Sequence, residues 1–504
     1  MPRFADDTAS SGIDHRYEGD GEYFEGGGLA TLDCDGNGLA DLYIAGGAAP
    51  AAMYRNASAV GGALRFERLP SSVTDLSSVT GAYPIDIDSD GQLDLVVLRH
   101  AEGNRVLRGL GGCRFEDATD ALGLHSGDRW TTGFSATWEG ANTLPTLAFA
   151  NYRRPGTTEC AVSQLVRPEG DKYGQPVDLA PGLCALSVLF SDWNHTGRHD
   201  LRVSNDRNYY RDGGEQLWRI EDGAPAVLYT AADGWQPLQI WGMGIASRDV
   251  DGDGVPEVFL TSQGDSKLQQ LDADAARPEY HDIAVQEGVA ATRPYTGSDV
   301  LPSTAWHPQF ADVNNDSYAD LFVTKGNVDA QPDYAAHDPS NLLIARPGGH
   351  FDERGEQAGL ASFHRSRGAT VSDLNLDGLL DIVVVNREEN VSVYRNLGAG
   401  SQGSPDTGDH WLGLRLQQPA PNVDAVGAWV EVRSGGRSQT MQLTIGGGHA
   451  SGELGWIHVG LGGATAADVR VSWPDGTVGP WHTLAADSLQ VIDRVAGPQP
   501  WVPR

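Results

Sequence analysis

Short apolar runs alternate with acidic turns along most of the chain. In the first unit an apolar run at 28–32 enters an acidic loop, a second run at 41–45 leaves it, and a third run follows at 52–56. A fourth run centres on a Phe, as at 65–67 and again at 350–352. Runs this short, bounded by turn-forming residues, predict β-strands. The sequence shows neither a heptad pattern nor a long amphipathic helix.

The acidic loop recurs at nearly regular intervals, which indicates an internal repeat. Six copies carry oxygen-bearing residues at alternate positions ahead of an apolar run, and a seventh, degenerate copy lies at 138–147. The copies begin at residues 33, 86, 138, 192, 249, 312 and 373, so they are 53, 52, 54, 57, 63 and 61 residues apart. About four short strands per unit are typical of a β-propeller blade, in which neighbouring blades cover the sheet faces. We therefore expect seven blades.

The repeat ends after Asn396, where a stretch rich in Gly and Ser follows. Beyond it, alternating runs at 429–432 and 469–473 and a turn at 474–476 predict a second, smaller β domain. The expected division of the chain is a propeller at 1–400, a linker at 401–408, the second β domain at 409–494 and a tail at 495–504.

Composition narrows the classes of partner. The chain has 504 residues, and 36 Lys and Arg against 68 Asp and Glu give a formal net charge of -32. A protein this acidic repels phosphate backbones and anionic lipid surfaces, so we expect no nucleic acid and no membrane surface as a partner. No apolar run reaches the roughly 18 residues that a membrane helix needs, which argues against membrane insertion. The oligomeric state stays open.

Cysteine usage and the first residues bear on location. The four cysteines (Cys34, Cys113, Cys160 and Cys184) are too few for a disulfide scaffold and form no CxxC pair. A zinc-thiolate site and a thioredoxin-type redox role are therefore disfavoured, whereas a bridge between Cys160 and Cys184 stays open. The N-terminal residues lack the apolar segment of a signal peptide. Either a leader lies outside this numbering or the protein stays in the cytoplasm, where it is made.

The six complete loops match the needs of a calcium ion. Each offers side-chain oxygens at positions 1, 3, 5 and 9 and a backbone carbonyl at position 7, and all but one have glycine at position 6, with Ser317 as the exception. Unpaired carboxylates this close would repel one another, so the spacing favours a bound cation over simple solvated hairpins. Magnesium prefers fewer protein ligands and strict octahedral geometry, so it is the weaker candidate. We expect about six calcium ions.

The residues expected to hold these ions, with position 7 contributing its carbonyl oxygen, are Asp33, Asp35, Asn37, Leu39 and Asp41; Asp86, Asp88, Asp90, Gln92 and Asp94; Asp192, Asn194, Thr196, Arg198 and Asp200; Asp249, Asp251, Asp253, Val255 and Glu257; Asp312, Asn314, Asp316, Tyr318 and Asp320; and Asp373, Asn375, Asp377, Leu379 and Asp381. The degenerate copy has no carboxylate at any ligand position, so we expect it to be metal-free. A site closed by one loop leaves no open coordination position, so the ions are expected to be mainly structural. The expected fold class is therefore all-β: a seven-bladed β-propeller with calcium loops in six blades, followed by a small C-terminal β domain.

Several of these motifs resemble known families. The acidic loops and their trailing strands, with the segments at 53–56 and 393–396, resemble the FG-GAP/VCBS repeats of integrin-α-type propellers. Four later stretches resemble the ASPIC/UnbV domain, namely those at 422–428, 446–448, 458–462 and 471–476. Together the motifs cover nearly the whole chain and resemble the cartilage acidic protein family and its bacterial homologues. The resemblance implies a calcium-binding, extracellular or periplasmic protein and no particular activity.

Chain direction locates a candidate functional face. Each acidic loop joins the first and second strands of its unit, so residues before the first strand and after the second lie together on the opposite face. The residues expected to bind a ligand there are Trp130, Trp241, Trp306, Arg207, Asp206 and Arg367, and those expected to transfer protons or clamp a carboxylate are His307, Glu25, His364 and Arg365. The alternatives are packing of the Trp residues between blades and a solvated rim of weak ion pairs.

His307 stands out because of its position. Five residues before each loop start, six units carry Gly or Ser, and the remaining unit carries His307. Small residues suit the crowded centre of a propeller, so we expect His307 to project into the mouth of the central channel. There a neutral imidazole could act as a base near pH 7.

Two classes of function remain. The first is a calcium-binding propeller that binds a glycan, a small anionic ligand or a protein partner on the face opposite the calcium loops. The alternative is an enzyme of lyase, dehydratase or cyclase type, in which His307 and Glu25 transfer protons. The fold resemblance includes cell-adhesion heads, polysaccharide lyases and sugar dehydratases, so it does not choose between them. No phosphate loop, nucleophile elbow or HExxH motif is present in the sequence.

Overall fold

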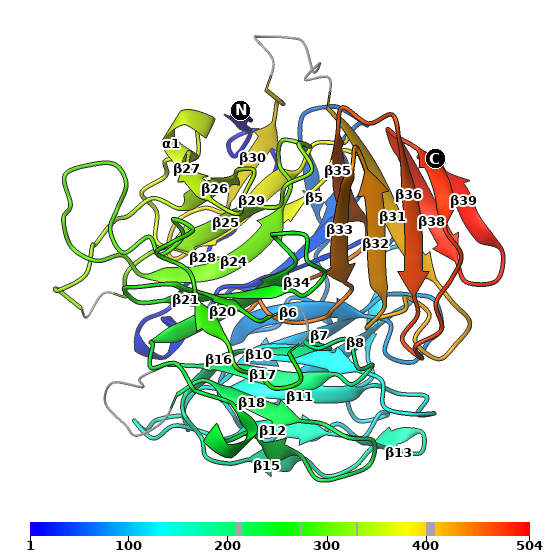
Figure 1. Cartoon of the computed structure of the whole chain (residues 1–504). Helices are drawn as coiled ribbons and strands as arrows, with labels where there is room; N and C mark the ends of the chain where they lie inside the picture. The colour runs from blue at the N-terminus through cyan, green and yellow to red at the C-terminus, as the bar shows by residue number, and fades with distance from the viewer. Residues whose placement is uncertain (207–213, 273–274, 329–330, 400–408, 504) are drawn as a thin grey trace.

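The protein is all-β and consists largely of four-stranded sheets (Figure 1). The computed structural model describes residues 1–503 except 207–213, 273–274, 329–330 and 400–408. The linker expected at 401–408 lies outside the described residues. Within the described part, the α-helical residues form the single turn α1 (Gly355–Ala358), and no helix is long and apolar enough to span a membrane.

Each repeat unit forms one antiparallel sheet, in which successive strands are neighbours; we call these the repeat sheets. In chain order they contain β2 (Leu29–Leu32), β3 (Asp41–Ile44), β4 (Ala52–Asn56) and β5 (Phe66–Arg68); β6 (Val79–Ile85), β7 (Asp94–Arg99), β8 (Arg105–Gly109) and β9 (Phe115–Asp117); β10 (Thr131–Thr137), β11 (Thr146–Asn151), β12 (Ser163–Val166) and β15 (Val177–Leu179); β16 (Ala185–Ser191), β17 (Asp200–Asn205), β18 (Gln216–Arg219) and β19 (Val227–Leu228); β20 (Gly242–Arg248), β21 (Glu257–Ser262), β22 (Lys267–Gln270) and β23 (His281–Asp282); β24 (Ala305–Ala311), β25 (Asp320–Lys325), β26 (Asn341–Ala345) and β27 (Phe351–Glu353); and β28 (Ser366–Ser372), β29 (Asp381–Asn386) and β30 (Ser392–Asn396).

The order of contacts between the repeat sheets is circular. The first strand of each sheet contacts the first strand of the next, from β2 through β6, β10, β16, β20 and β24 to β28, and β28 in turn contacts β2. The last sheet takes its fourth strand from the start of the chain, because β1 (Phe4–Asp6) pairs with β30. A small hairpin of β13 (Pro168–Glu169) and β14 (Lys172–Tyr173) extends the third repeat.

The first strands are buried on both faces. Every residue of β6, β10, β16 and β28 is buried. Aromatic rings pack within and between these sheets; the Phe134 ring lies 5.6 Å from Tyr83 of the neighbouring sheet and 5.3 Å from Phe149 of its own sheet. Strands covered on both sides lose the alternation of a half-exposed strand. This explains why the sequence shows them as continuous runs of apolar and small residues.

The C-terminal region forms two further sheets around a core of its own, which includes Leu412, Val430 and Val469. Their strands are β35 (Ile457–Gly462), β31 (His410–Gln417), β38 (Ser488–Asp493) and β39 (Gly497–Trp501) in one sheet, and β33 (Arg437–Gln442), β32 (Trp429–Ser434), β36 (Ala466–Ser472) and β37 (His482–Ala485) in the other. The strands predicted at 429–432 and 469–473 are present. Part of the expected tail at 495–504 is instead a strand, because β39 pairs with β38 along residues 497–501.

Residues 445–454 leave the C-terminal sheets and enter the centre of the repeat sheets; we call them the inserted segment. Within it, β34 (Gly452–Leu454) pairs in parallel with β2. Single β-bridges join Ile445, Gly446, Gly448 and Ser451 to the first strands β10, β16, β20 and β6. The backbone N–H of His449 donates to Nδ1 of His307 on β24, at 3.0 Å. The sequence did not indicate this insertion.

Small residues in the first strands make room for the inserted segment. A Cβ atom added at Gly28 would lie 1.7 Å from the carbonyl oxygen of Ala450, and one added at Gly81 would lie 2.2 Å from the same atom. At Gly368 it would lie 2.2 Å from Oγ of Ser451. The preference for small residues five positions before each loop therefore reflects a chain segment that occupies the centre.

All four cysteines are paired in disulfides. The Cys160–Cys184 bridge, which the sequence left open, is present. The other bridge joins Cys34 in the first acidic loop to Cys113 in the turn between β8 and β9, 79 residues away. The Sγ atoms of Cys34 and Cys113 lie 2.9 and 3.4 Å from Oδ2 of Asp41. This bridge therefore fixes the first loop to the second repeat sheet.

The fit at the centre predicts the effect of a single methyl group. Gly28→Ala should lower the free energy of unfolding by about 2 kcal/mol or more, because the added Cβ overlaps the backbone of the inserted segment. Gly455→Ala is the matched control, since its Cβ would meet nothing within 4 Å, and it should change stability by less than about 0.5 kcal/mol. Urea unfolding followed by tryptophan fluorescence measures both. Equal stabilities of the two variants would contradict the tight fit.

Candidate metal loops and ligand pocket

The first residue of each complete acidic loop organises the loop backbone. The Asp249 carboxylate accepts the backbone N–H groups of Gly252 at 2.8 Å and Gly254 at 3.1 Å. The first Asp of each other complete loop likewise accepts N–H groups four or five residues later. Each loop therefore curls around one carboxylate.

The residue at position 9 is fully buried and links the loop to the sheet. Asp94 has no exposed surface. Its carboxylate accepts the N–H of Ile87 at 2.9 Å and that of Gly109, on the third strand, at 2.7 Å. Asp41, Asp320 and Asp381 make the same pair of bonds in their own units. These carboxylates link the second strand, on which they stand, to the loop backbone and to the end of the third strand.

Burial raises the pKa of these carboxyl groups. The pKa is raised to about 8 for Asp41, Asp94 and Glu257 and to about 7 for Asp86, mainly by desolvation and also by neighbouring carboxylates. A divalent cation among these oxygens would favour their charged forms.

Three loops already bring carboxylate oxygens within 4.8 Å of one another, namely Asp33 with Asp35 and Asp41, Asp86 with Asp88 and Asp90, and Asp249 with Asp251 and Glu257. Such sets of hard oxygen donors suit calcium. The expected residues of these three loops could therefore hold a calcium ion.

The loop that begins at Asp192 differs from the others. The Arg198 guanidinium donates to both oxygens of Asp200, with Nε–Oδ1 at 2.9 Å and an Nη–Oδ2 distance of 3.2 Å. Trp193 and Tyr229 also donate to Oδ2 of Asp200. The sequence assigned Arg198 only a carbonyl ligand. Its side chain instead supplies a positive charge within the loop.

The degenerate loop has a comparable arrangement. Glu139 is buried, and its carboxylate accepts Nε of Arg167 at 2.8 Å and the hydroxyl of Thr146 at 2.5 Å. A guanidinium and a carboxylate of the same chain thus stabilise this turn. That no metal binds here stays a prediction.

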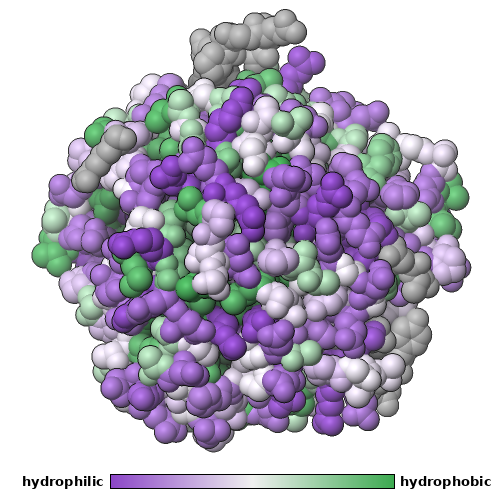
Figure 2. All heavy atoms as spheres, turned by 180° about the vertical axis from the view of Figure 1, so that it is seen from behind, coloured by the Kyte–Doolittle hydropathy of each residue, from purple (hydrophilic) through white to green (hydrophobic). Residues whose placement is uncertain are grey.

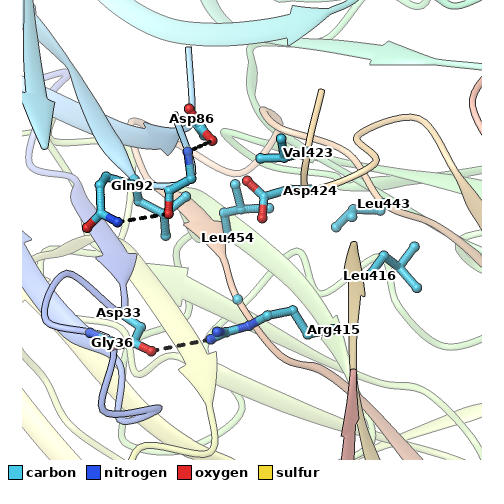
Figure 3. Close-up of a pocket in the computed structure, with 13 residues that line it drawn as sticks. Asp33, Gly36, Asp86, Gln92, Arg415, Leu416, Val423, Asp424, Leu443 and Leu454 are labelled. Carbon is cyan, nitrogen blue, oxygen red and sulfur yellow. Dashed lines mark hydrogen bonds and ion pairs between the residues drawn. The ribbon is translucent and has the colours of Figure 1, made fainter. Parts of the chain in front are cut away.

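The C-terminal sheets lie against the acidic loops. Arg415 contacts Asp33 at 3.5 Å, Nε1 of Trp429 contacts Asp192 at 3.4 Å, and the His458 ring contacts the Asn315 side chain at 2.7 Å. A cavity of about 150 Å³ lies between these parts. Figure 3 shows Arg415 directed toward Asp33, and Asp424 on the side nearer Asp86. Burial raises the pKa of Asp424 to about 6. The loop face is therefore covered by the C-terminal region.

A second pocket, of about 350 Å³, is lined mostly by residues that precede first strands or follow second strands, together with Met243 and Trp306 at the start of β20 and β24. Four of the expected site residues line it, namely Glu25, Trp241, Trp306 and Asp206. The other lining residues were not among the predicted site residues; they are Tyr152, Met243, Gln263, Thr304, Val328 and Gln331. Gln263 follows a second strand, so the same chain-direction rule could have found it. Tyr152 donates its hydroxyl to Asp206 at 2.6 Å.

Two more expected residues lie behind the pocket lining. The guanidinium carbon of Arg367 lies 4.1 Å from the centre of the Trp306 ring, and this side chain donates to the carbonyls of Phe24, Gly326 and Ser366. The Trp130 ring packs edge-on against Tyr152 at 5.0 Å. Both residues are buried and support lining residues.

The expected proton-transfer group is not assembled. His307 is buried under the inserted segment, with Nδ1 accepting the N–H of His449, and it lines a separate cavity of about 200 Å³ rather than the pocket that contains Glu25, so its predicted place beside Glu25 is wrong. His364 forms an ion pair with Glu389, and Arg365 forms one with Glu388 at 2.6 Å. Of the four residues only Glu25 lines the pocket. Arg207 lies outside the described residues.

Removal of a buried carboxylate should lower the stability of the protein even without metal. Asp94→Ala should lower the free energy of unfolding by about 3 kcal/mol in metal-free buffer, because two buried N–H groups lose their acceptor. Asp90→Ala in the same loop is the control, since Asp90 is exposed and should change stability by less than about 0.5 kcal/mol. Urea unfolding in the presence of a chelator measures both values. An Asp94→Ala variant as stable as Asp90→Ala would show that the carboxylate matters only as a metal ligand.

Comparison with known proteins identifies two segments. Residues 33–97 match the FG-GAP-like repeat, and residues 418–498 match the ASPIC and UnbV family. No curated protein is detectably similar to the chain.

Three solved structures are among those to which the chain shows similarity. An Agrocybe aegerita lectin, described as recognising non-reducing terminal N-acetylglucosamine, is 17% identical, with 71% of this chain and 88% of that chain covered and a TM-score of 0.40. The lectin BP39L from Burkholderia pseudomallei is 10% identical, with 76% and 99% covered and a TM-score of 0.46. A Trypanosoma rangeli sialidase is 8% identical, with 68% and 56% covered and a TM-score of 0.37. Similarity at this level identifies no ligand or activity. The two family matches place an FG-GAP-like repeat near the start of the chain and an ASPIC and UnbV domain near its C-terminal end.

Proposed function

We propose that the protein is a calcium-stabilised, seven-bladed β-propeller that binds a neutral glycan in the pocket lined by Trp241 and Trp306. In this proposal residues 1–400 form the propeller, and residues 409–494 form a domain that closes its loop face. The circular order of contacts among the first strands supports the ring. The pairing of β1 with β30 supports it further, because a strand from the start of the chain completes the last sheet.

The residues that line the pocket indicate the class of ligand. It combines two indole rings with carboxylate, amide and hydroxyl groups, from Glu25, Asp206, Gln263 and Thr304 among others. Aromatic faces pack against the apolar face of a sugar ring, while polar groups bind its hydroxyls. No arginine or lysine lines the pocket in the described part of the chain, which favours a neutral polyhydroxylated ligand over an anion. His307 and Glu25 line different cavities, which disfavours the lyase, dehydratase or cyclase alternative that pairs them for proton transfer.

We also propose that calcium occupies the complete loops other than the Asp192 loop. The convergent oxygens and the raised pKa values of buried carboxyl groups support a cation in these loops. In the Asp192 loop the Arg198 guanidinium takes the place of an ion on Asp200. The two disulfides favour an oxidising compartment, outside the cell or in the periplasm.

A binding screen with one variant tests the proposed ligand class. At least one neutral mono- or oligosaccharide should bind to the wild-type protein. Trp241→Ala should weaken the binding of that sugar about tenfold, because the stacking on the indole ring is lost. Trp481→Ala is the control, because Trp481 stacks with Arg433 and Arg470 on the C-terminal sheets, apart from the pocket. Isothermal titration calorimetry measures the affinities. Absence of binding by every neutral sugar, or equal loss in both variants, would refute the proposal.

Metal stoichiometry tests the role of Arg198. Arg198→Ala should bind one more calcium ion per chain than the wild-type protein, because Asp200 then lacks its positive partner and the loop retains its oxygen ligands. Arg167→Ala should bind the wild-type number, since the degenerate loop lacks carboxylates at the ligand positions. Equilibrium dialysis followed by atomic emission counts the ions. An unchanged count in Arg198→Ala would contradict the substitution of an ion by the guanidinium.

A further inference from the structure

Trp306 connects the ligand pocket with the centre of the molecule. It lines the pocket although only 1% of its surface is exposed, so it forms part of the pocket floor. Its Nε1 donates to the carbonyl of Gly326 at 2.6 Å, and its own carbonyl accepts the hydroxyl of Thr261 at 2.5 Å. These bonds fix one edge of the indole and the backbone. The orientation of the ring plane also depends on the side chains that pack against its two faces.

Two buried side chains pack against the indole. The Arg367 guanidinium carbon lies 4.1 Å from the ring centre, held by backbone carbonyls from three residues. The His449 ring centre lies 4.9 Å away, with the two ring planes inclined at 57°. Both side chains have no exposed surface. The indole therefore cannot turn unless one of them moves.

His449 belongs to the C-terminal region, although the pocket is built from the repeat sheets. It lies in the inserted segment between Gly448, which bridges to Ile245, and Ala450, whose carbonyl lies against Gly28. Its backbone N–H donates to His307. Neither ring nitrogen has a hydrogen-bond partner among the described residues. The side chain thus acts through the surface of its ring.

We propose that His449 is a positioning residue for the ligand pocket: the C-terminal domain presents it at the centre, where it and Arg367 clamp Trp306 in the orientation that forms the pocket floor. This inference rests on the proposed binding function and adds to it. It makes the pocket dependent on a domain that lies against the acidic loops. His307, expected to be catalytic, is here the acceptor that anchors the backbone of the positioning residue.

Fluorine NMR of the full-length protein, labelled with 5-fluorotryptophan, reports on Trp306 separately from binding. Trp306→Phe assigns the resonance. His449→Ala should shift or broaden it, and His449→Phe should restore it, because a phenyl ring replaces the packing surface. Glu453→Gln is the control on the same segment, since Glu453 accepts from Gln309 and Thr370 and does not line the pocket. If His449→Ala does not fold, His449→Gln replaces it as the variant without a ring.

Binding is measured with glucose, galactose, N-acetylglucosamine and cellobiose by calorimetry. Any of these sugars that binds the wild-type protein should bind at least tenfold more weakly to His449→Ala and normally to His449→Phe and Glu453→Gln. An unchanged Trp306 resonance in His449→Ala overturns the inference, and so does a shifted resonance with unchanged affinity. If no sugar binds the wild-type protein, the glycan proposal fails, whereas the resonance still decides whether His449 orients Trp306.

Discussion

The structure depends on the lack of side chains at its centre. Because Gly28, Gly81, Gly244 and Gly368 carry no Cβ, the first strands of the repeat sheets leave room for the backbone of the inserted segment. That segment then bonds to strands from separate sheets, most extensively where β34 adds to β2. Close packing of this kind tolerates little change in volume. A mutation at the centre therefore affects the repeat sheets and the C-terminal sheets together.

The acidic loops also join the repeat sheets to the C-terminal sheets, away from the centre. Their buried carboxylates hold the loop backbone and the third strand of each sheet, and their outer surfaces meet Arg415, Trp429 and His458 of the C-terminal sheets. Figure 2 shows that the face seen from behind is mostly hydrophilic, with hydrophobic residues in small, scattered groups. Between the two parts of the chain, polar contacts act together with apolar packing, because Val426, Ile445 and Leu454 belong to the same buried cluster as Tyr83 and Phe134.

Features that depend on residues close together in the sequence could be predicted from it. The strands, the acidic loops and the second β domain follow from local spacing, and the chain-direction rule correctly grouped Glu25, Trp241, Trp306 and Asp206. The pairing of β1 with β30 and the Cys34–Cys113 bridge join distant segments, and no local pattern marks them.

His307 shows how one missed distant contact leads to a wrong site. The small residues at the matching positions of the other units correctly indicated a restricted centre, but no local pattern indicates that residues 445–454 fill it. Arg198 shows a second limit of prediction from the sequence. It was expected to offer only its backbone carbonyl, but its side chain pairs with Asp200, because this buried carboxylate needs a positive partner.

Differential scanning calorimetry of the full-length protein in calcium tests the central claim most directly, namely that the inserted segment makes the repeat sheets and the C-terminal sheets one cooperative unit. The account predicts a single unfolding transition in the calorimeter. Near-ultraviolet circular dichroism should show that the tertiary structure of both parts is lost over the same temperature range. Two separated transitions, with the C-terminal sheets unfolding while the repeat sheets stay intact, would contradict it.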